Sequence, residues 1–416
     1  MWVRLLALRD FRNYEELEVD FPPPGVSLVG PNGAGKTNLL EAVHLLLSGR
    51  ALRAGREKEL IRWGAESYVV RAAVSREEGE TEVEVRGEAR GQEGSGRRTV
   101  LVNSTRIPSH DLPGFFSSVV FTPDDLELIK GSPKVRRAFL DRLLAGASSY
   151  YRHHLVRYER LLSQRNHVLR MAGGRVPAAG SELLRLHELF TESLLEVGSR
   201  LLERRRAALA RLARAAAQAY AMIDDPSPVG ADETGASGGA GGRPPLLGEP
   251  RLSIRYVPVA APEEEVETGP SENGPPDLPW DLARCREELV AIWRRVERWE
   301  WQQGRSLVGP HRDDIELLAG GINLRTYGSQ GQQRSVVLAL KLAELNFLRE
   351  ETGRWPVLLL DDVFSELDPV RRARFMAALP AGVQVFLTCA EPGLVDQLSV
   401  GGRPTFAVEG GRLTPV

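Results

Sequence analysis

The sequence predicts an α/β fold whose two halves come from the two ends of the chain, with a mostly helical arm inserted between them. A glycine-rich loop, Gly30–Thr37, lies between a short apolar strand and a helix, and a second apolar strand ends in Asp361 and Asp362. More than 300 residues separate the two motifs, and apolar residues recur at helical spacing in much of the intervening chain. We divide the chain into a first head part, an inserted arm and a second head part, at residues 1–129, 130–303 and 304–416.

Composition places the chain among ordinary globular proteins. Its 416 residues are 42% hydrophobic and 26% charged, which is enough for two or three domains with sizeable cores. The formal net charge of −2 excludes a uniformly basic protein that coats nucleic acid. Two cysteines, Cys285 and Cys389, fit a reducing compartment. Because the chain shows neither a secretory signal nor the roughly 18 consecutive apolar residues of a membrane span, we expect a cytoplasmic protein.

The first head part is expected to consist of strands around one helix. Gly25–Val29 is a short apolar strand that leads into the glycine-rich loop. Leucine and valine then recur at helical spacing from Leu39 to Leu47. Further strands are predicted at Tyr68–Val74, Thr81–Val85, Thr99–Val102 and Val119–Phe121.

The arm is predicted to contain amphipathic helices and two flexible loops. The helical pattern from Lys130 to Tyr220 is too interrupted for an extended coiled coil, and residues 130–214 carry 18 basic and 7 acidic side chains. A further helix is expected at Asp281–Gln303, where tryptophans pack the arm. Residues 226–250 and 262–279 are rich in Gly, Pro, Ser or acidic residues and cannot bury enough apolar surface to become ordered.

The glycine-rich loop matches the phosphate-binding pattern G-x-x-x-x-G-K-[ST]. Its glycines permit backbone angles that direct successive N–H groups into one cavity, and the following helix adds its positive end. In such a loop the lysine reaches the β- and γ-phosphates of a nucleoside triphosphate, while the hydroxyl residue binds Mg²⁺. The predicted nucleotide site therefore comprises Gly30, Pro31, Asn32, Gly33, Ala34, Gly35, Lys36 and Thr37.

The second head part supplies an acidic partner for this loop. A helix is expected from about Gln332, followed by buried strands at Val357–Leu360 and Val383–Leu387. The first of these strands leads directly into Asp361 and Asp362. An aspartate at the end of such a strand usually holds the Mg²⁺ of the nucleotide. We assign Asp361 to the metal, through water, and Asp362 to polarising the attacking water.

A third phosphate-facing element is predicted at residues 328–332, which lie shortly before the acidic strand. A Ser-Gly loop that opens a helix directs backbone N–H groups outward. Because one chain cannot easily present two such loops to one γ-phosphate, we expect Ser329 and Gln332 to face the nucleotide of a second copy in a two-fold dimer. An N-capped helix explains the bare pattern equally well.

Several stretches together resemble one known family. They are Leu8–Tyr14, Gly30–Thr37, Phe121–Asp125, Lys130–Pro133, Gly309–Asp314, Gly328–Arg334 and Leu358–Asp368. Their order and sequence resemble the RecF family of bacterial recombination-repair ATPases, in the SMC/Rad50 branch of the ABC ATPases. The resemblance covers both chain ends and the first arm helices, and it implies an ABC/SMC-type P-loop ATPase head.

The resemblance also implies a function. Members of this family are ATP-dependent homodimers that bind single- and double-stranded DNA at gaps and junctions. With the partners RecO and RecR they load the RecA recombinase, which supports replication restart and the SOS response. On this chain the resemblance places ATP at Gly30–Thr37, makes Ser329–Gln332 the signature loop that acts in trans, and makes Ser365–Asp368 a loop that crosses the dimer interface.

Two departures from related ATPases bear on mechanism. Most ABC relatives carry glutamate after the metal-binding aspartate, whereas Asp362 is one methylene shorter, which implies slow, DNA-stimulated hydrolysis that acts as a switch. The strand at Val383–Leu387 is followed by Thr388-Cys-Ala rather than by the histidine that senses the γ-phosphate in transporters. The identity of the switch residue is therefore left open.

The main alternative is the nucleotide-binding subunit of another ABC-type assembly, above all of a membrane transporter. That class predicts a shorter chain without a large helical insert, and a histidine after the strand at Val383–Leu387. A long-coiled-coil SMC protein is excluded by the short, interrupted middle of the chain. A metabolic P-loop kinase leaves Ser329–Gln332 and the basic segment unexplained.

Overall fold

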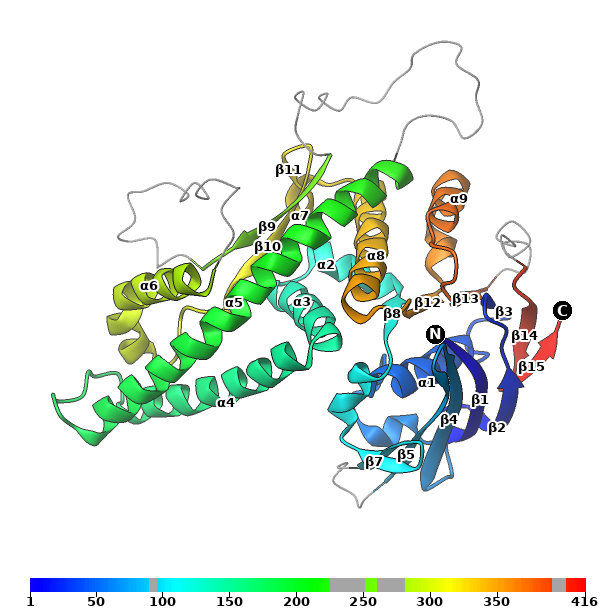
Figure 1. Cartoon of the computed structure of the whole chain (residues 1–416), viewed down its shortest axis with the longest axis horizontal. Coiled ribbons are helices and arrows are strands. Elements are labelled where there is room, and N and C mark those ends of the chain that lie inside the picture. Colours follow the sequence, from blue (N-terminus) through cyan, green and yellow to red (C-terminus); the bar gives the residue numbers. More distant parts are fainter. Residues whose placement is uncertain (90–95, 225–250, 260–280, 391–401) are drawn as a thin grey trace, which may run out of the picture. The chain divides into compact units, whose positions relative to one another are not determined.

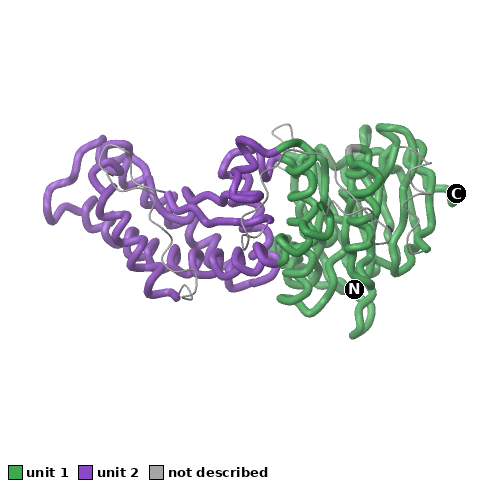
Figure 2. Tube along the Cα trace, turned by 90° about the horizontal axis from the view of Figure 1, so that it is seen from above, with its two compact units in different colours: residues 1–126, 215–244, 329–416 green, residues 127–214, 245–328 purple. Residues whose placement is uncertain are grey.

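The computed structural model describes residues 1–89, 96–224, 251–259, 281–390 and 402–416. The chain forms two compact units (Figure 2). Unit 1 comprises Met1–Leu126, Ala215–Pro244 and Ser329–Val416, and unit 2 comprises Glu127–Arg214 and Pro245–Gly328. The loops predicted at 226–250 and 262–279 lie outside the described residues.

The residue at which the chain passes from the arm back to the head differs from the predicted boundary. The sequence analysis places residues 304–328 in the second head part, whereas in the structure they group with unit 2. Strand pairing explains the difference. The strand β10 (Asp314–Ala319) pairs antiparallel with β9 (Leu252–Val257) and with β11 (Ile322–Asn323), so that it joins a small sheet of unit 2.

The sheet that carries the candidate site has six strands in the order β15-β14-β3-β13-β12-β8. All neighbours are parallel except β14 and β15. The strands are β3 (Gly25–Val29), β8 (Ser118–Phe121), β12 (Val357–Asp361), β13 (Val385–Cys389), β14 (Thr405–Glu409) and β15 (Arg412–Pro415). Every residue of β3, β12 and β13 is buried, as expected for central parallel strands. Because parallel strands end at one edge, the loop after β3, Asp362 after β12 and the end of β13 lie together.

The second sheet of unit 1 is antiparallel, in the order β2-β1-β4-β5-β6-β7. Its strands are β1 (Trp2–Phe11), β2 (Tyr14–Asp20), β4 (Ser67–Arg76), β5 (Gly79–Glu88), β6 (Arg97–Val102) and β7 (Thr105–Ile107). In β4, alternate side chains such as Tyr68, Val70 and Val74 are buried. They share one apolar core with the parallel sheet and with the helix α1 (Lys36–Ser48) (Figure 1).

The helices of unit 1 have clear start and stop signals. The helix α8 (Gln330–Thr352) begins at a capping box formed by Ser329 and Gln332 and ends at Gly353, which adopts a left-handed conformation. The helix α9 (Pro369–Ala377) begins with proline after the N-cap Asp368. Short 3₁₀ helices are η1 (Glu57–Leu60), η2 (Ser109–Gly114), η3 (Pro123–Leu126) and η5 (Val363–Glu366).

Unit 2 is mostly helical, as the sequence predicts. Its helices are α2 (Glu127–Lys130), α3 (Pro133–Ala147), α4 (Ser149–Met171), α6 (Leu282–Gln303), α7 (Leu324–Tyr327) and most of α5 (Glu182–Ile223), whose last residues belong to unit 1. Ser148 caps α4 and Asp281 caps α6. The prediction that the tryptophans pack the arm is confirmed for Trp293 and Trp301, which are buried.

Part of the basic excess of residues 130–214 serves the interior of unit 2. Arg165 is 1% exposed and donates to the carboxylate of Glu300 at 2.6 Å, and the indole N–H of Trp293 donates to the same carboxylate. Three further arginines of this segment are buried against acids, in the pairs Arg136–Asp314, Arg205–Asp141 and Arg206–Glu288. A buried arginine is retained only when it is paired, so these side chains act in folding rather than as surface charge.

Within the described residues, none of the helices combines the length and the hydropathy that spanning a bilayer requires.

Candidate nucleotide site

The loop after β3 depends on glycine at two positions. Gly30 has φ of 152°, and a Cβ atom there would lie 2.4 Å from the carbonyl oxygen of Val408. Gly35 has φ of 114°, and its Cβ would lie 2.4 Å from the side-chain nitrogen of Asn13. Neither position accommodates another residue without displacing a neighbour. Gly35 is also the N-cap of α1 and no described side chain caps this helix, so its first-turn N–H groups are oriented to receive an anion.

The β1–β2 turn holds the loop from one side. The side-chain amide of Asn13 donates to the carbonyl of Ala34 at 3.0 Å, and the hydroxyl of Tyr14 donates to the carbonyl of Gly35 at 2.9 Å. Burial raises the pKa of Tyr14, so its hydroxyl stays a hydrogen-bond donor. These contacts give a physical reason for the stretch Leu8–Tyr14, which the sequence analysis identified only by resemblance.

Lys36 lies inside the loop. Its side chain is nearly buried, and its ammonium donates to the carbonyl oxygens of Gly30 at 2.6 Å and Pro31 at 3.0 Å. The ammonium of Lys36 is thus held against the loop by uncharged acceptors. Exchange of these neutral acceptors for phosphate oxygens pairs the charged ammonium with charged acceptors, which strengthens its hydrogen bonds.

Thr37 and Asp361 are brought together from opposite ends of the sequence. The hydroxyl of Thr37 donates to Oδ1 of Asp361 at 2.7 Å, and Asp361 is 2% exposed. A hydroxyl and a carboxylate side by side are the oxygen donors that Mg²⁺ uses at nucleotide sites, where phosphates and waters complete its shell. The residues present therefore fit the magnesium ion predicted from the sequence.

Thr388 contacts both aspartates. Its hydroxyl donates to Oδ1 of Asp361 at 3.0 Å and accepts the N–H of Asp362 at 2.9 Å. The sequence predicts this strand at Val383–Leu387, whereas β13 spans Val385–Cys389. The strand therefore includes Thr388, which lies in register with Asp361. Asp362 has φ of 52°, a left-handed conformation that is uncommon for non-glycine residues and is enriched at functional sites. Thr388 therefore stands at the position that the sequence analysis left open.

Replacement of Thr388 by valine is expected to lower the free energy of unfolding by about 1–3 kcal/mol, because buried polar groups of Asp361 and Asp362 lose their partner. ATP turnover is expected to fall as well, since both aspartates lose an orienting contact. Urea unfolding and a phosphate-release assay measure the two effects. Thr388→Ser keeps the hydroxyl and serves as the control; equal stability of the valine variant and the wild type contradicts this role.

Two residues of the site lie outside the motifs identified in the sequence. The guanidinium of Arg53 donates to Oδ2 of Asp361 at 2.9 Å. Glu41, which is 1% exposed on α1, accepts the backbone N–H of Arg53 at 3.0 Å and the side chain of Arg12 at 2.7 Å. In the sequence Arg53 stands in a basic cluster, with Arg50, Arg56, Lys58 and Arg62, which suggests contacts to DNA rather than to Asp361. The signal for Glu41 is a glutamate on an apolar helix face.

The predicted signature loop forms a helix start. The N–H of Gln332 donates to the hydroxyl of Ser329 at 3.2 Å, and the N–H of Ser329 donates to the side-chain carbonyl of Gln332 at 3.0 Å. Both side chains are exposed or half-buried, so they remain accessible from outside the chain. The structure thus joins Thr37 to Asp361, whereas Ser329 and Gln332 bond to each other.

Arg371 of α9 lies against this helix start. A Cβ atom on Gly331 would lie 3.2 Å from its guanidinium, which also pairs with Asp224 at 2.8 Å and Asp368 at 3.0 Å. Burial acts to raise the pKa of Asp368, but the backbone N–H and guanidinium of Arg371 outweigh it and lower that pKa. Arg371 thus pairs with Asp368 and with Asp224, and Asp224 in turn accepts the hydroxyl of Ser335 in α8 at 3.1 Å.

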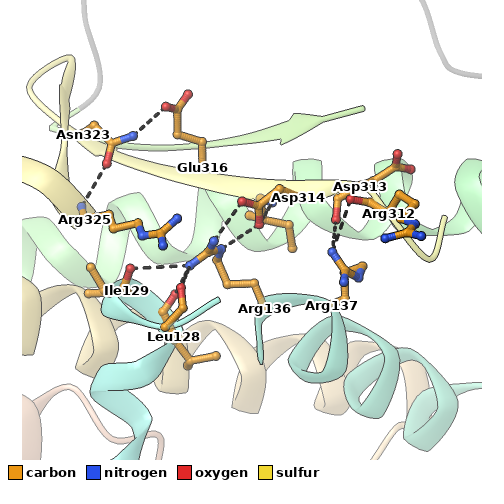
Figure 3. Close-up of polar contacts among 12 residues, drawn as sticks. Leu128, Ile129, Arg136, Arg137, Arg312, Asp313, Asp314, Glu316, Asn323 and Arg325 are labelled. Atoms are coloured by element: carbon orange, nitrogen blue, oxygen red, sulfur yellow. Dashed lines mark hydrogen bonds and ion pairs between the residues drawn. The ribbon is translucent and has the colours of Figure 1, made fainter. Parts of the chain in front are cut away.

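The stretch Gly309–Asp314 organises unit 2 (Figure 3). Arg136 of α3 donates to both carboxylate oxygens of Asp314 at 2.8 Å, and Arg137 donates to the carbonyl oxygen of Asp313 at 2.6 Å. The carboxyl of Asp313 accepts the hydroxyl of Tyr256, and burial raises its pKa. The stretch Gly309–Asp314 thus joins β10 to α3, through Arg136 and Arg137, and to β9, through Tyr256.

Comparison with known proteins agrees with this architecture. The fold and the site define a P-loop head of the RecF/RecN/SMC class, and the family model described as "RecF/RecN/SMC N terminal domain" matches residues 2–403. The DNA replication and repair protein RecF of Symbiobacterium thermophilum is 38% identical, over 94% of this chain and 92% of its own length. The RecF protein of Bacillus subtilis is 30% identical, over 99% of this chain and 100% of its own length. The chain belongs to the RecF family.

Solved structures agree with this assignment. The structure of the recombination mediator protein RecF-ATP in the RecFOR pathway matches with a TM-score of 0.77 and 28% identity, over 100% of this chain and 97% of that chain. An Smc head domain with an extended coiled coil, derived from Pyrococcus furiosus, matches with a TM-score of 0.51 and 16% identity, over 100% of this chain and 96% of that chain. The second match shows the fold alone.

Proposed function

We propose that this protein is an ATP-dependent DNA-binding protein of recombinational repair, in which ATP drives two copies to close on DNA. The observation that carries the proposal is the contact between Thr37 and Asp361 beside the glycine-rich loop. It joins the phosphate-binding and metal-binding halves of a nucleotide site across the whole sequence. Membership of the RecF family supports the choice of DNA repair over other uses of such a head.

The nucleotide is proposed to bind with its phosphates over Gly30–Thr37. The N–H groups of the loop and the start of α1 receive the phosphate oxygens, and Lys36 donates to the β- and γ-phosphates. Thr37 and Asp361 would hold the Mg²⁺ of the nucleotide. The metal ion neutralises phosphate charge when it is bound. The RecF structure that matches this chain is named as a complex with ATP, which supports this ligand.

Closure of a dimer is proposed to complete the site. Ser329 and Gln332 are accessible at the start of a long helix, which can direct N–H groups at the γ-phosphate of a partner copy. The segment Ser365–Asp368 then crosses the interface, and Arg371 links Asp368 to Asp224, which accepts the hydroxyl of Ser335 in α8. A nucleotide that bridges the two copies favours the closed dimer by its extra contacts in that state.

Hydrolysis is proposed to open the dimer. Asp362 polarises the attacking water, and Thr388 fixes its backbone and the carboxylate of Asp361. The shorter side chain of Asp362, compared with glutamate, supports a slow reaction that times the release of DNA. The protein is then a switch rather than a metabolic enzyme.

DNA binding is proposed to be independent of base sequence. Arginine contacts to phosphates position a protein on DNA without reading bases, and unit 2 carries the basic excess of residues 130–214 beyond its buried pairs. The RecFOR pathway named for the matching structure supports RecO and RecR as partners in loading RecA. Cys285 and Cys389 are buried and form no disulfide, which supports a cytoplasmic location.

Fluorescence anisotropy of a labelled junction between duplex and single-stranded DNA tests this function. We expect tighter binding with Mg-ATP than without nucleotide. We also expect an affinity loss of roughly a thousandfold or more between about 50 and 200 mM salt if six or more phosphates are contacted. Unchanged DNA affinity with and without Mg-ATP contradicts the proposal. The Lys36→Arg variant, which retains the DNA surface, is the control for the nucleotide effect.

A further inference from the structure

Within the described part of the chain, the buried carboxylate of Asp361 contacts one charged side chain. Its Oδ1 accepts two neutral hydroxyl groups, from Thr37 at 2.7 Å and from Thr388 at 3.0 Å. Its Oδ2 accepts the guanidinium of Arg53 at 2.9 Å. A carboxylate that is 2% exposed requires a compensating positive charge, and here Arg53 supplies it.

Arg53 reaches this carboxylate from the solvent side. Its side chain is 54% exposed, whereas that of Asp361 is 2% exposed. The guanidinium therefore exchanges with water easily, while the carboxylate does not. A metal ion that enters from solution with the nucleotide therefore encounters a carboxylate that is already paired with Arg53.

The backbone of Arg53 is fixed although its side chain is accessible. Oε1 of Glu41 accepts the N–H groups of Arg53 at 3.0 Å and Ala54 at 3.4 Å. Oε2 of the same carboxylate pairs with Arg12 at 2.7 Å, and Glu41 is 1% exposed. Glu41 thus anchors the arginine on α1, the helix that also carries Thr37. When the guanidinium leaves Asp361, it stays within reach of the site.

We propose that Arg53 is an internal counter-cation of Asp361 and competes with Mg²⁺ for that carboxylate, with Glu41 as the residue that positions it. This inference rests on the proposed role of Asp361 as the metal-binding acid. Both cations need the same buried charge, which Arg53 already neutralises through Oδ2. Binding of the metal with its nucleotide therefore releases Arg53, and Arg53 weakens metal binding in the open site.

Competition of this kind is reciprocal, so removal of the arginine strengthens metal binding. We expect Arg53→Ala to bind Mn²⁺ at least about fivefold more tightly than the wild type, a change at the lower end of typical coupling between two ligands. Arg53→Gln, which keeps polar bulk without charge, is expected to show the same gain. Arg53→Lys, which keeps the charge, is expected to fall between the wild type and alanine.

Electron paramagnetic resonance of Mn²⁺ measures this directly on the full chain, because the signal of hydrated Mn²⁺ disappears on binding. Titrations are run without nucleotide and with a non-hydrolysable ATP analogue. Arg56→Ala is the matched control, since Arg56 is an exposed arginine of the same segment. Thermal unfolding of each variant shows that it is folded.

The Mn²⁺ affinities of the Arg53 and Arg56 variants decide whether the inference holds. A gain in Mn²⁺ affinity in Arg53→Ala and Arg53→Gln but not in Arg56→Ala supports the inference. No gain in the Arg53 variants, or an equal gain in Arg56→Ala, overturns it, because the effect is then absent or one of general charge. A fluorescent ATP analogue titrated into the wild type separates this from the proposed function: failure to bind it refutes the nucleotide site itself, whereas binding without an Arg53 effect refutes only the inference.

Discussion

Lys36→Arg is expected to weaken ATP binding strongly. The ammonium of Lys36 fits between two carbonyl oxygens of the loop, in a nearly buried position where the larger, planar guanidinium cannot reproduce its contacts. Loss of a desolvated charge pair costs about 2–5 kcal/mol, which corresponds to roughly 30-fold or more in ATP affinity. Titration with a fluorescent ATP analogue measures the loss.

The charge-conserving control is Lys58→Arg. Lys58 is exposed on η1, so the same change there is expected to leave ATP affinity unaltered. Circular dichroism establishes that Lys36→Arg is folded. An ATP affinity of Lys36→Arg close to that of the wild type refutes the assignment of Lys36 to the phosphates.

Ser329→Arg is expected to bind ATP normally and to remain monomeric. Ser329 belongs to the start of α8 and not to the loop at Gly30–Thr37, so the nucleotide-binding surface of its own chain is unchanged. A long cation in place of a small hydroxyl blocks close approach of a partner's nucleotide site. Sedimentation velocity with Mg-ATP measures the mass, and titration with an ATP analogue measures affinity.

Loss of the helix cap requires a separate control, because removal of an N-cap hydroxyl costs about 1 kcal/mol by itself. Ser329→Ala removes the cap without adding bulk. We expect it to lower stability comparably while retaining a weakened ATP-dependent dimer. Normal ATP-driven dimerisation of Ser329→Arg overturns the proposal that the site is completed in trans.

The sequence predicts well those features that local patterns encode. The spacing of Gly30, Gly35 and Lys36 predicts a phosphate loop, and an apolar strand that ends in Asp361 predicts its acidic partner. The structure confirms that the two are adjacent, because both follow buried parallel strands of one sheet. Predicted helices and strands in the first head part and the arm are confirmed with shifts of a few residues.

Features that depend on pairing between distant segments are not visible in the sequence. Thr388 reaches both aspartates through the register of β13 against β12. Arg53 donates to Asp361 from a segment whose backbone Glu41 holds, 308 residues earlier in the chain. The segment at 304–328 belongs to unit 2 because β10 pairs with β9. Likewise, the basic excess of the arm includes arginines such as Arg165, whose acidic partners lie far along the chain.

The central claim, that ATP joins two copies on DNA, is tested most directly by sedimentation velocity of the wild-type chain with a labelled duplex–single-strand junction. With Mg-ATP we expect a complex that contains two chains and one DNA molecule. Without nucleotide we expect single chains and unbound DNA. A single chain on DNA in both conditions, or two chains without any dependence on nucleotide, contradicts the account.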